Sequence, residues 1–212
     1  MDYIKIAAIY ARDTNGSKKL IEGKFQDDTV EYLSNCTWQF TEKVDGTNCG
    51  VVWDGHRVRF QGRTADTDIP ATLVNHLLDL FGSPETEELF EQKFGSMSVI
   101  LFGEGYGGKI GANGPKYCKT PRFILFDVYI PSQNLWMTRG SVEDVATVFG
   151  LDVVPIIMEG ALADGVSYVK DGHNSTLSAD VKMEGLVARP KVEVLDRRGR
   201  RVIVKIKYRD FQ

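Results

Sequence analysis

Five ionisable side chains stand at the ends or in the middle of apolar runs that are typical of β-strands. They are Glu104, Asp127, Glu184, Lys205 and Lys207. A single acid of this kind is usually a structural ion-pair partner, and lysines on a strand usually protect a sheet edge. Five such residues together predict side chains that converge on one polar cleft. Acids and lysines in one cleft suit a triphosphate and its Mg²⁺.

Lys43 is the candidate nucleophile. It follows the apolar run 37–40 and precedes Asp45-Gly46, after which a second apolar run, 49–53, begins. Asp-Gly between two apolar runs is a strong hairpin signal, so we expect Lys43 at a strand end beside a tight turn. Lysine attacks well only when neutral, and desolvation or a neighbouring cation favours the neutral form. A solvated hairpin lysine is the ordinary alternative on turn statistics alone.

Short strands must position these side chains. Apolar runs predict strands at residues 1–10, 97–102, 123–130 and 183–190, and further hairpins at 51–60 and 192–208. Because side chains alternate between the two faces of a strand, Lys205 and Lys207 are expected to point the same way. The glycine- and lysine-rich segment 105–119 is expected to be a loop.

Helices separate the groups of strands. They are expected from about Asp68 to Phe81, from Ser83 to Phe94, from Ser141 to Phe149 and near 161–170, with a helical turn near 18–24. An order of strands, two helices, strands, a helix and strands, with many hairpins, indicates mainly antiparallel sheets. The predicted fold class is therefore α+β.

Composition narrows the class of protein. The chain has 212 residues, of which 42% are hydrophobic and 26% charged, and a formal net charge of −3. This is ordinary for a soluble protein of one large or two small domains, and any nucleic-acid surface must be local. Three cysteines without metal-ligand spacing favour a reducing, cytoplasmic setting. The first residues do not form a signal peptide, and no apolar run approaches ~18 residues, so no membrane association is expected.

Taken together, the motifs resemble those of the covalent nucleotidyltransferase superfamily, which includes polynucleotide ligases and mRNA capping guanylyltransferases. The resemblance rests on five segments in the right order: Lys43-Val44-Asp45-Gly46, Phe102-Gly103-Glu104, Phe123–Val128, Glu184-Gly185-Leu186-Val187 and Val204-Lys205-Ile206-Lys207. Each segment is weak alone, but the five together cover most of residues 42–207.

Within this superfamily, the chain is most similar to the branch of RNA ligase 2-like proteins. Glu42-Lys43-x-x-Gly46-Thr47-Asn48, Arg63-Thr64 and the final Lys-x-Lys carry this likeness. Two residues depart from the branch. Asp45 replaces the histidine common in the phage form and matches DNA ligases, and Arg189 stands where a lysine is usual.

The resemblance implies a nucleotidyltransferase adenylation fold, with mainly antiparallel sheets flanked by helices around a central nucleotide cleft. It implies a single domain over residues 1–212. An OB-fold or C-terminal accessory domain, which many relatives add, is not expected here because the sequence ends five residues after Lys207.

The implied activity is that of an ATP-dependent RNA ligase. Lys43 would form a lysyl-AMP intermediate, the AMP would pass to a 5′-phosphate, and a 3′-OH would then seal the strand. RNA ends or a nicked duplex would be the substrate. Three alternatives remain open: a compact DNA or nick-sealing ligase, a capping-type guanylyltransferase, and a non-catalytic module that binds nucleotide or nucleic acid. The oligomeric state stays open.

The resemblance also implies roles for individual residues. Lys43, Lys205, Lys207 and Glu184 would be catalytic, with Glu184 holding hydrated Mg²⁺, which Mn²⁺ can replace. The nucleotide-binding set would be Glu42, Asn48, Arg63, Glu104, Phe126, Asp127 and Arg189. Within that set, Glu104 would accept a hydrogen bond from a ribose hydroxyl, and Phe126 would stack on adenine. Arg63 would meet a phosphate or the ribose.

Two basic segments are candidates for contact with nucleic acid. One is the loop that carries Lys109, Lys116 and Lys119, and the other is the turn that carries Arg198 and Arg200. Short charge runs are more often solvated turns, which is the alternative for both. If they bind phosphates, affinity must fall steeply with salt.

Overall fold

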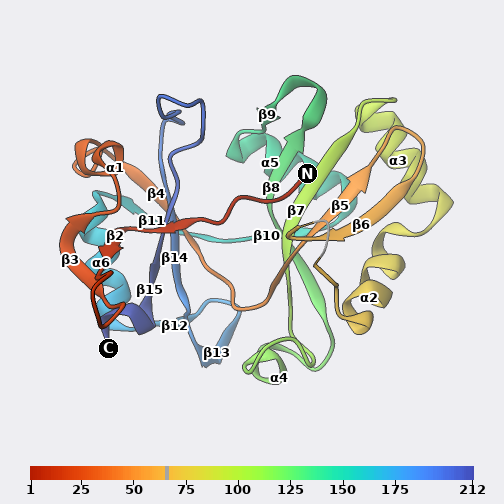
Figure 1. The fold of residues 1–212 in the computed structure, drawn as a ribbon. Helices are drawn as coiled ribbons and strands as arrows, with labels where there is room; N and C mark the ends of the chain where they lie inside the picture. The colour runs from red at the N-terminus through yellow and green to blue at the C-terminus, as the bar shows by residue number, and fades with distance from the viewer. Residues whose placement is uncertain (65–66) are drawn as a thin grey trace. The chain divides into compact units, whose positions relative to one another are not determined.

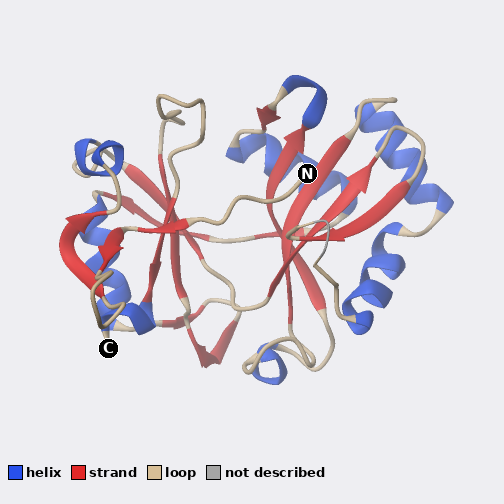
Figure 2. Cartoon of the chain, viewed as in Figure 1, coloured by secondary structure: helices blue, strands red, loops and turns tan. Residues whose placement is uncertain are grey.

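The computed structural model describes residues 1–64 and 67–212, which form two compact units (Figure 1). Unit 1 comprises Met1–Ile4 and Asp45–Val154, and unit 2 comprises Lys5–Val44 and Pro155–Gln212. Each unit is therefore built from two separate stretches of chain. Antiparallel sheets and helices occur in both units (Figure 2), which confirms the predicted α+β class.

The sheet of unit 1 has the strand order β10-β8-β7-β5-β6, and β9 pairs with β8. Its strands are β5 (Thr47–Trp53), β6 (Val58–Gly62), β7 (Val99–Tyr106), β8 (Arg122–Ile130), β9 (Leu135–Trp136) and β10 (Asp152–Val153). All neighbours are antiparallel except β10, which runs parallel to β8. The predicted hairpin at 51–60 is confirmed, because Trp53 of β5 pairs with Val58 of β6.

Three long helices contribute to the core of unit 1: α2 (Ala71–Phe81), α3 (Pro84–Phe94) and α5 (Arg139–Phe149). Their apolar residues pack with one face of the sheet, including Cys49, Val51 and Trp53 of β5. Since strand residues alternate, Asn48 and Val52 point to the opposite face. Two short turns complete the unit, α4 (Gly114–Tyr117) and the 3₁₀ helix Pro131–Gln133.

The main sheet of unit 2 has the order β1-β15-β14-β4-β11. Its strands are β1 (Ala7–Ala8), β4 (Trp38–Glu42), β11 (Ile156–Gly160), β14 (Gly185–Pro190) and β15 (Val204–Lys207). Two small hairpins lie outside it, β2 (Tyr10–Arg12) with β3 (Leu20–Phe25) and β12 (Asn174–Ser175) with β13 (Ser178–Lys182). The helices are α1 (Asp28–Tyr32), α6 (Leu162–Asp171) and the 3₁₀ helix Tyr208–Phe211. Leu162, Val166 and Val169 of α6 pack in one core with the sheet.

Four predictions about the elements were wrong or incomplete. The segment around Lys43 is no hairpin, because β4 pairs with β14 and β11 whereas β5 pairs with β6 and β7. The expected helical turn at 18–24 is largely strand β3. The expected loop at 105–119 contains α4 and the last residues of β7. In the expected hairpin at 192–208, only β15 is a strand, and it pairs with β14.

The predicted helices are confirmed with small shifts at their ends. Ser83 caps α3 with its hydroxyl, and α3 ends at Phe94 as expected. Helix α5 begins two residues earlier than expected, after Thr138, whose side chain accepts from the Ser141 amide. Over the described residues, no helix combines the length and the apolar character needed to cross a membrane.

Candidate active site

In unit 2, one face of the sheet packs on the core and the other carries the candidate lysines. Trp38 and Phe40 of β4 are fully buried and alternate with half-buried Thr41. Lys43 continues this alternation on the side away from the core. On β15, Lys205 and Lys207 alternate with buried Ile206. The prediction that these two lysines share a face is therefore confirmed.

Glu184 joins two of these lysines. The Lys43 ammonium donates to Glu184 Oε2 at 2.6 Å, and the Lys207 ammonium donates to Glu184 Oε1. The backbone sets this geometry. The amide of Lys43 donates to the Gly185 carbonyl at 2.9 Å, and Gly185 of β14 pairs with Lys207 of β15. Three strand ends from distant parts of the sequence therefore meet at one carboxylate.

Burial and neighbouring charges shift the pKa of Glu184 in opposite directions, whereas they shift the pKa of Lys205 in the same direction. Burial alone would raise the pKa of the Glu184 carboxyl, but the charge of Lys43 and the hydrogen bonds from both lysines outweigh it, so the pKa is lowered. Burial lowers the pKa of Lys205, and the positive charges of Lys207 and Lys43 lower it further. The arrangement holds a carboxylate among cations, one of which has a weakened hold on its proton.

Arg189 lies on the same face of the sheet, farther along β14. Val187 of this strand pairs with Lys205, and Arg189 follows it by two residues. Arg189 is half-buried. The predicted catalytic residues and Arg189 therefore belong to one surface of unit 2.

Glu42, which the sequence motif predicts to bind nucleotide, lies on the opposite face of β4 from Lys43. It shares the buried face of Trp38 and Phe40 and is 2% exposed. Its carboxylate accepts hydrogen bonds from the Ser175 hydroxyl and from the Thr176 amide (2.9 Å) and hydroxyl (2.5 Å). These contacts link β4 to the end of β12 and to the turn that follows it, on the face of β4 opposite Lys43.

In unit 1, Asn48 and Glu104 lie side by side. Asn48 of β5 pairs in register with Glu104 of β7, at the end of the sheet where β5 begins. The side-chain oxygen of Asn48 is buried and has no hydrogen-bond partner within the described residues. A buried acceptor without a donor costs free energy, so a group that donated a hydrogen bond to this oxygen would bind favourably.

Phe126 sits at an irregularity of strand β8. The pairing of β7 with β8 shifts between Phe102 and Gly103, so that Asp127 and Leu125 oppose neighbouring residues and Phe126 is the extra one. A bulge of this kind changes the direction of a side chain. Phe126 is half-buried between buried neighbours of β8, and the Tyr3 ring meets it edge-on at 5.1 Å.

The structure places Asp127 and Arg63 in unit 1 as well. Asp127 is fully buried and accepts a hydrogen bond from the Tyr3 hydroxyl at 2.5 Å. Arg63 follows β6, is exposed, and its carbonyl accepts from the Tyr3 amide at 2.8 Å. Tyr3 thus contacts three candidate residues or their backbone. Nothing in the sequence indicated this, because Tyr3 and Asp127 lie far apart along the chain.

The residues of unit 2 fit a hydrated divalent cation better than a directly bound one. Among residues 1–64 and 67–212, no group of three or more His, Cys, Asp or Glu side chains could hold a metal. Glu184 uses one oxygen for each lysine, yet a carboxylate offers about four acceptor sites. Mg²⁺ commonly keeps its waters and needs few carboxylates, so Glu184 could receive such an ion through water.

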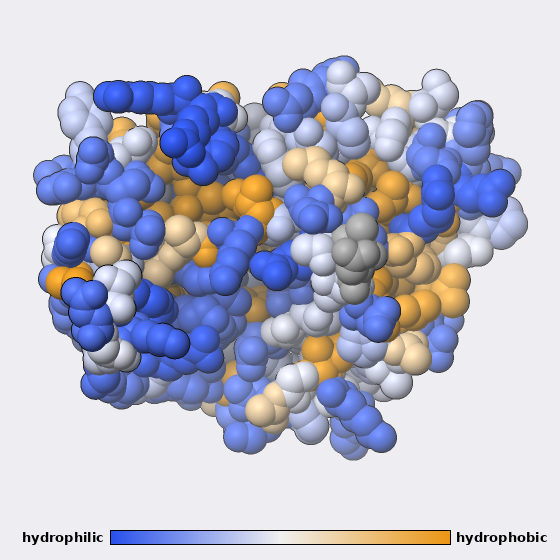
Figure 3. Space-filling view, viewed as in Figure 1, coloured by the Kyte–Doolittle hydropathy of each residue, from blue (hydrophilic) through white to orange (hydrophobic). Residues whose placement is uncertain are grey.

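The two basic segments differ in structure. Lys109, Lys116 and Lys119 are exposed on the folded segment after β7. Arg200 instead pairs with Asp196 within its own turn at 2.6 Å. The hydrogen bond from the Arg200 backbone amide lowers the pKa of Asp196 most, and with the Arg200 side chain and the Arg198 amide it brings the pKa to about 2. The turn belongs to the hydrophilic projection between β14 and β15 (Figure 3).

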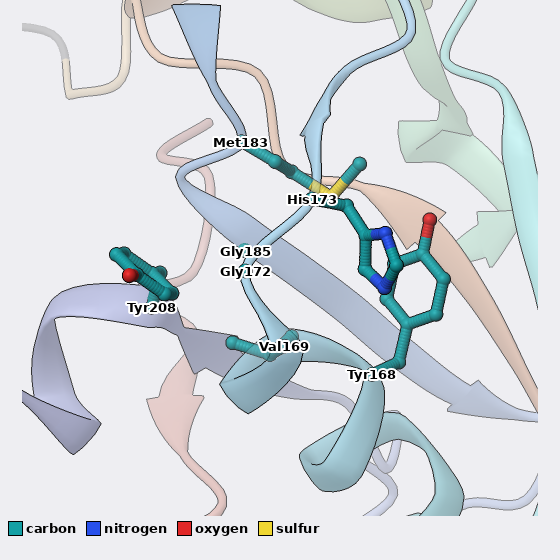
Figure 4. Close-up of a pocket in the computed structure, with 7 residues that line it drawn as sticks. All are labelled: Tyr168, Val169, Gly172, His173, Met183, Gly185 and Tyr208. Carbon is teal, nitrogen blue, oxygen red and sulfur yellow. The ribbon is translucent and has the colours of Figure 1, made fainter.

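A small pocket in unit 2 is lined by the two sequence neighbours of Glu184 and by residues of α6 and the 3₁₀ helix Tyr208–Phe211 (Figure 4). Its walls include Met183, Gly185 and Tyr208, together with Tyr168 and His173. The rings of Tyr168 and His173 stack with centroids 4.0 Å apart. The side chains fill the space so closely that no water fits, which makes it a packing feature rather than a ligand site.

Comparisons with known proteins agree with this architecture. A family model described as RNA ligase matches residues 36–207. No curated protein sequence matches the chain significantly. Among solved structures, a variant of Naegleria gruberi RNA ligase with ATP and Mn matches with a TM-score of 0.67 at 18% identity, covering 98% of this chain and 56% of that one.

Two further structures of the Naegleria protein give the same picture. An apo variant has a TM-score of 0.68 at 17% identity and covers 100% of this chain and 57% of its own. A variant with AMP and Mn has a TM-score of 0.64 at 18% identity, and the match covers 97% of this chain and 61% of that one. The chain therefore spans little more than half the length of these proteins, and at such identity the likeness establishes the fold. Because the family model covers most of the sequence, the chain belongs to the RNA ligase family.

Proposed function

We propose that the chain acts as an ATP-dependent RNA ligase whose nucleophile is Lys43. The observation that carries this proposal is the contact of Lys43 and Lys207 with the two oxygens of Glu184. Nucleotidyl transfer to a lysine needs a nucleophile, cations for the phosphate and an acid that orients them. This surface of unit 2 offers all three kinds of group.

The Lys43 ammonium would first lose its proton to solvent, and the resulting neutral amine would attack the α-phosphorus of ATP. A nitrogen–phosphorus bond forms, the bond to pyrophosphate breaks, and lysyl-AMP results. Lys205 and Lys207 would stabilise the negative charge that develops on the α-phosphate, as fixed cations do in transfer reactions. Arg189 would contact a phosphate through its planar fork of donors.

Residues of unit 1 would recognise the nucleotide. Glu104 would accept a hydrogen bond from a ribose hydroxyl, and Phe126 would stack on adenine. Arg63 would contact a phosphate or the ribose. Asn48, whose buried oxygen has no partner within the described residues, would help to place the strands for sealing.

The remaining steps would join nucleic acid. AMP would pass from Lys43 to a 5′-phosphate, and a 3′-OH would displace AMP to form the phosphodiester. Hydrated Mg²⁺, or Mn²⁺ in its place, would be held at Glu184 through water and would neutralise phosphate charge when bound. The substrate would be RNA ends or a nicked duplex.

Incubation with labelled ATP and, separately, with labelled GTP tests the proposal. We expect a covalent adduct with ATP that requires a divalent metal and is lost in Lys43→Ala. An adduct with GTP alone would indicate a guanylyltransferase, and an adduct of wild-type yield in Lys43→Ala would contradict the proposal. RNA and DNA nicks offered to the adenylylated protein then decide the preferred strand.

A further inference from the structure

The segment from Gly107 to Lys119 is a built structure rather than a free turn. Ile110 is 4% exposed and belongs to the core of unit 1. Tyr117 is also buried, and its ring meets the Tyr106 ring edge-on at 5.6 Å. The amide of Gly108 donates to the Cys118 carbonyl at 2.9 Å, which joins the two ends of the segment. We call residues 107–119 the lysine loop.

Asp45 holds this loop from outside. The Asn113 side-chain amide donates to Asp45 Oδ2 at 3.2 Å, and the Asp45 amide lies 3.5 Å from the Tyr117 hydroxyl. Asn113 directly precedes α4, so these contacts reach the middle of the loop. Asp45 follows Lys43 by two residues in the sequence. One of the two positions at which the sequence departs from the RNA ligase 2-like pattern therefore contacts the lysine loop.

The sequence of the loop supplies basic residues and no acidic ones. Residues 107–119 contain Lys109, Lys116 and Lys119 and no Asp or Glu, and Arg122 follows at the start of β8. All four side chains are exposed. The arginine-rich turn of unit 2 differs, because Arg200 is paired with Asp196 inside that turn. Of the two basic segments, the lysine loop is thus the better suited to a polyanion.

We propose that the lysine loop binds the sugar-phosphate backbone of the strand to be sealed and that Asp45 is the positioning residue that fixes the loop. This inference rests on the proposed ligase function. Asp45 itself is negative and would repel a phosphate. The Asp45 side chain can therefore favour binding of nucleic acid only by holding the loop through its hydrogen bond with Asn113.

The affinities of two Asp45 variants for nucleic acid distinguish a positioning role of Asp45 from an effect of its charge. Asp45→Ala and Asp45→Asn both remove the negative charge, but only Asp45→Asn keeps an oxygen that can accept from Asn113. If Asp45 acts only through its charge, both variants bind nucleic acid more tightly. If Asp45 positions the loop, Asp45→Ala binds more weakly than Asp45→Asn. Asn113→Ala breaks the same bond from the loop side and should match Asp45→Ala, and the double variant should lose no more than either single one.

Affinity for a nicked RNA duplex would be measured by fluorescence anisotropy across a salt series. A triple variant, Lys109→Ser with Lys116→Ser and Lys119→Ser, should lower the slope of log affinity against log salt by about 2.7, since each phosphate contact contributes about 0.9. The matched control replaces Lys19, Lys24 and Lys93 by Ser. These lysines are also exposed, and the control changes the net charge equally. It should keep the wild-type slope.

Adduct formation with ATP is measured in parallel on every variant. Wild-type protein that forms no adduct would refute the ligase function itself. Wild-type protein that forms the adduct, with equal slopes for the loop variant and the control, would overturn the role of the loop. A lowered slope in the loop variant together with tighter binding by Asp45→Ala would overturn the positioning role of Asp45.

Discussion

The two units hold their candidate residues in different ways. In unit 2, ion pairs join Lys43 and Lys207 through the carboxylate of Glu184. In unit 1, Asn48 and Glu104 are placed by strand register and Phe126 by a bulge. Unit 2 thus carries preorganised charge, which suits a transfer step, whereas unit 1 carries separate polar and aromatic groups, which suit recognition. Variants in the two units should therefore change different kinetic parameters.

The largest effect is expected from Lys207→Ala in unit 2. Loss of one cation beside a developing phosphate charge should slow adduct formation by ~10²–10³-fold. The KM for ATP should change much less, because the interaction strengthens in the transition state. Single-turnover kinetics with labelled ATP measure both. Lys24→Ala, which removes an exposed lysine of the same unit, is the control, and equal rates for the two variants would place Lys207 outside the chemistry.

Glu104→Gln in unit 1 should show the opposite pattern. The glutamine oxygen can still accept, but a hydrogen bond to a charged group contributes about 1.5–3 kcal/mol and a neutral one about 0.5–1.5 kcal/mol, so the KM for ATP should rise by about five- to tenfold. The rate at saturating ATP should fall much less. Glu88→Gln removes an exposed acid of the same unit and should behave as the wild type. A loss confined to the rate would remove the distinction between the units.

Glu42→Ala tests whether the residue next to the nucleophile is structural. The change removes the acceptor for Ser175 and Thr176 and should lower the free energy of unfolding by about 1–3 kcal/mol. Urea titration measures this loss, and the KM for ATP should stay near that of the wild type. A raised KM with unchanged stability would restore the nucleotide-binding role that the sequence motif predicts.

The smallest effect is a gain in stability from Lys205→Met. Burial and the charges of Lys207 and Lys43 lower the pKa of Lys205, so the folded state carries an energetic cost while this lysine is protonated. The cost is fully present below the folded pKa and is lost as pH rises towards the unfolded value of about 10.4. Thermal unfolding should therefore show the greatest stabilisation at neutral pH. A gain that grows with pH would contradict the sign of this shift.

Local patterns in the sequence predicted much of the fold, and long-range pairing explains most of what they missed. Ser83-Pro84 and the spacing of Leu73, Leu77 and Phe81 identify two helices because capping and amphipathicity are local. The Asp45-Gly46 turn signal is local too, yet the runs on either side of it join different sheets. Gly46 is required for another reason, since a Cβ there would lie 2.2 Å from the Gly105 carbonyl oxygen.

The candidate site was predictable to a similar degree. Alternation correctly placed Lys205 and Lys207 on one face. The same rule applied to Trp38, Phe40 and Glu42 would have predicted that Glu42 faces the core. The bulge at Phe126 and the contact of Tyr3 with Asp127 depend on strands that meet only in the folded chain. No spacing in the sequence could have revealed them.

The position of the adduct tests the central claim most directly. After incubation with ATP and Mg²⁺, the protein would be digested and each peptide examined by mass spectrometry for the added mass of one AMP. We predict that AMP is found on Lys43 alone, and that Glu184→Ala greatly lowers its amount without moving it. AMP on Lys205, Lys207 or any other lysine, or the absence of any modified peptide, would contradict the account.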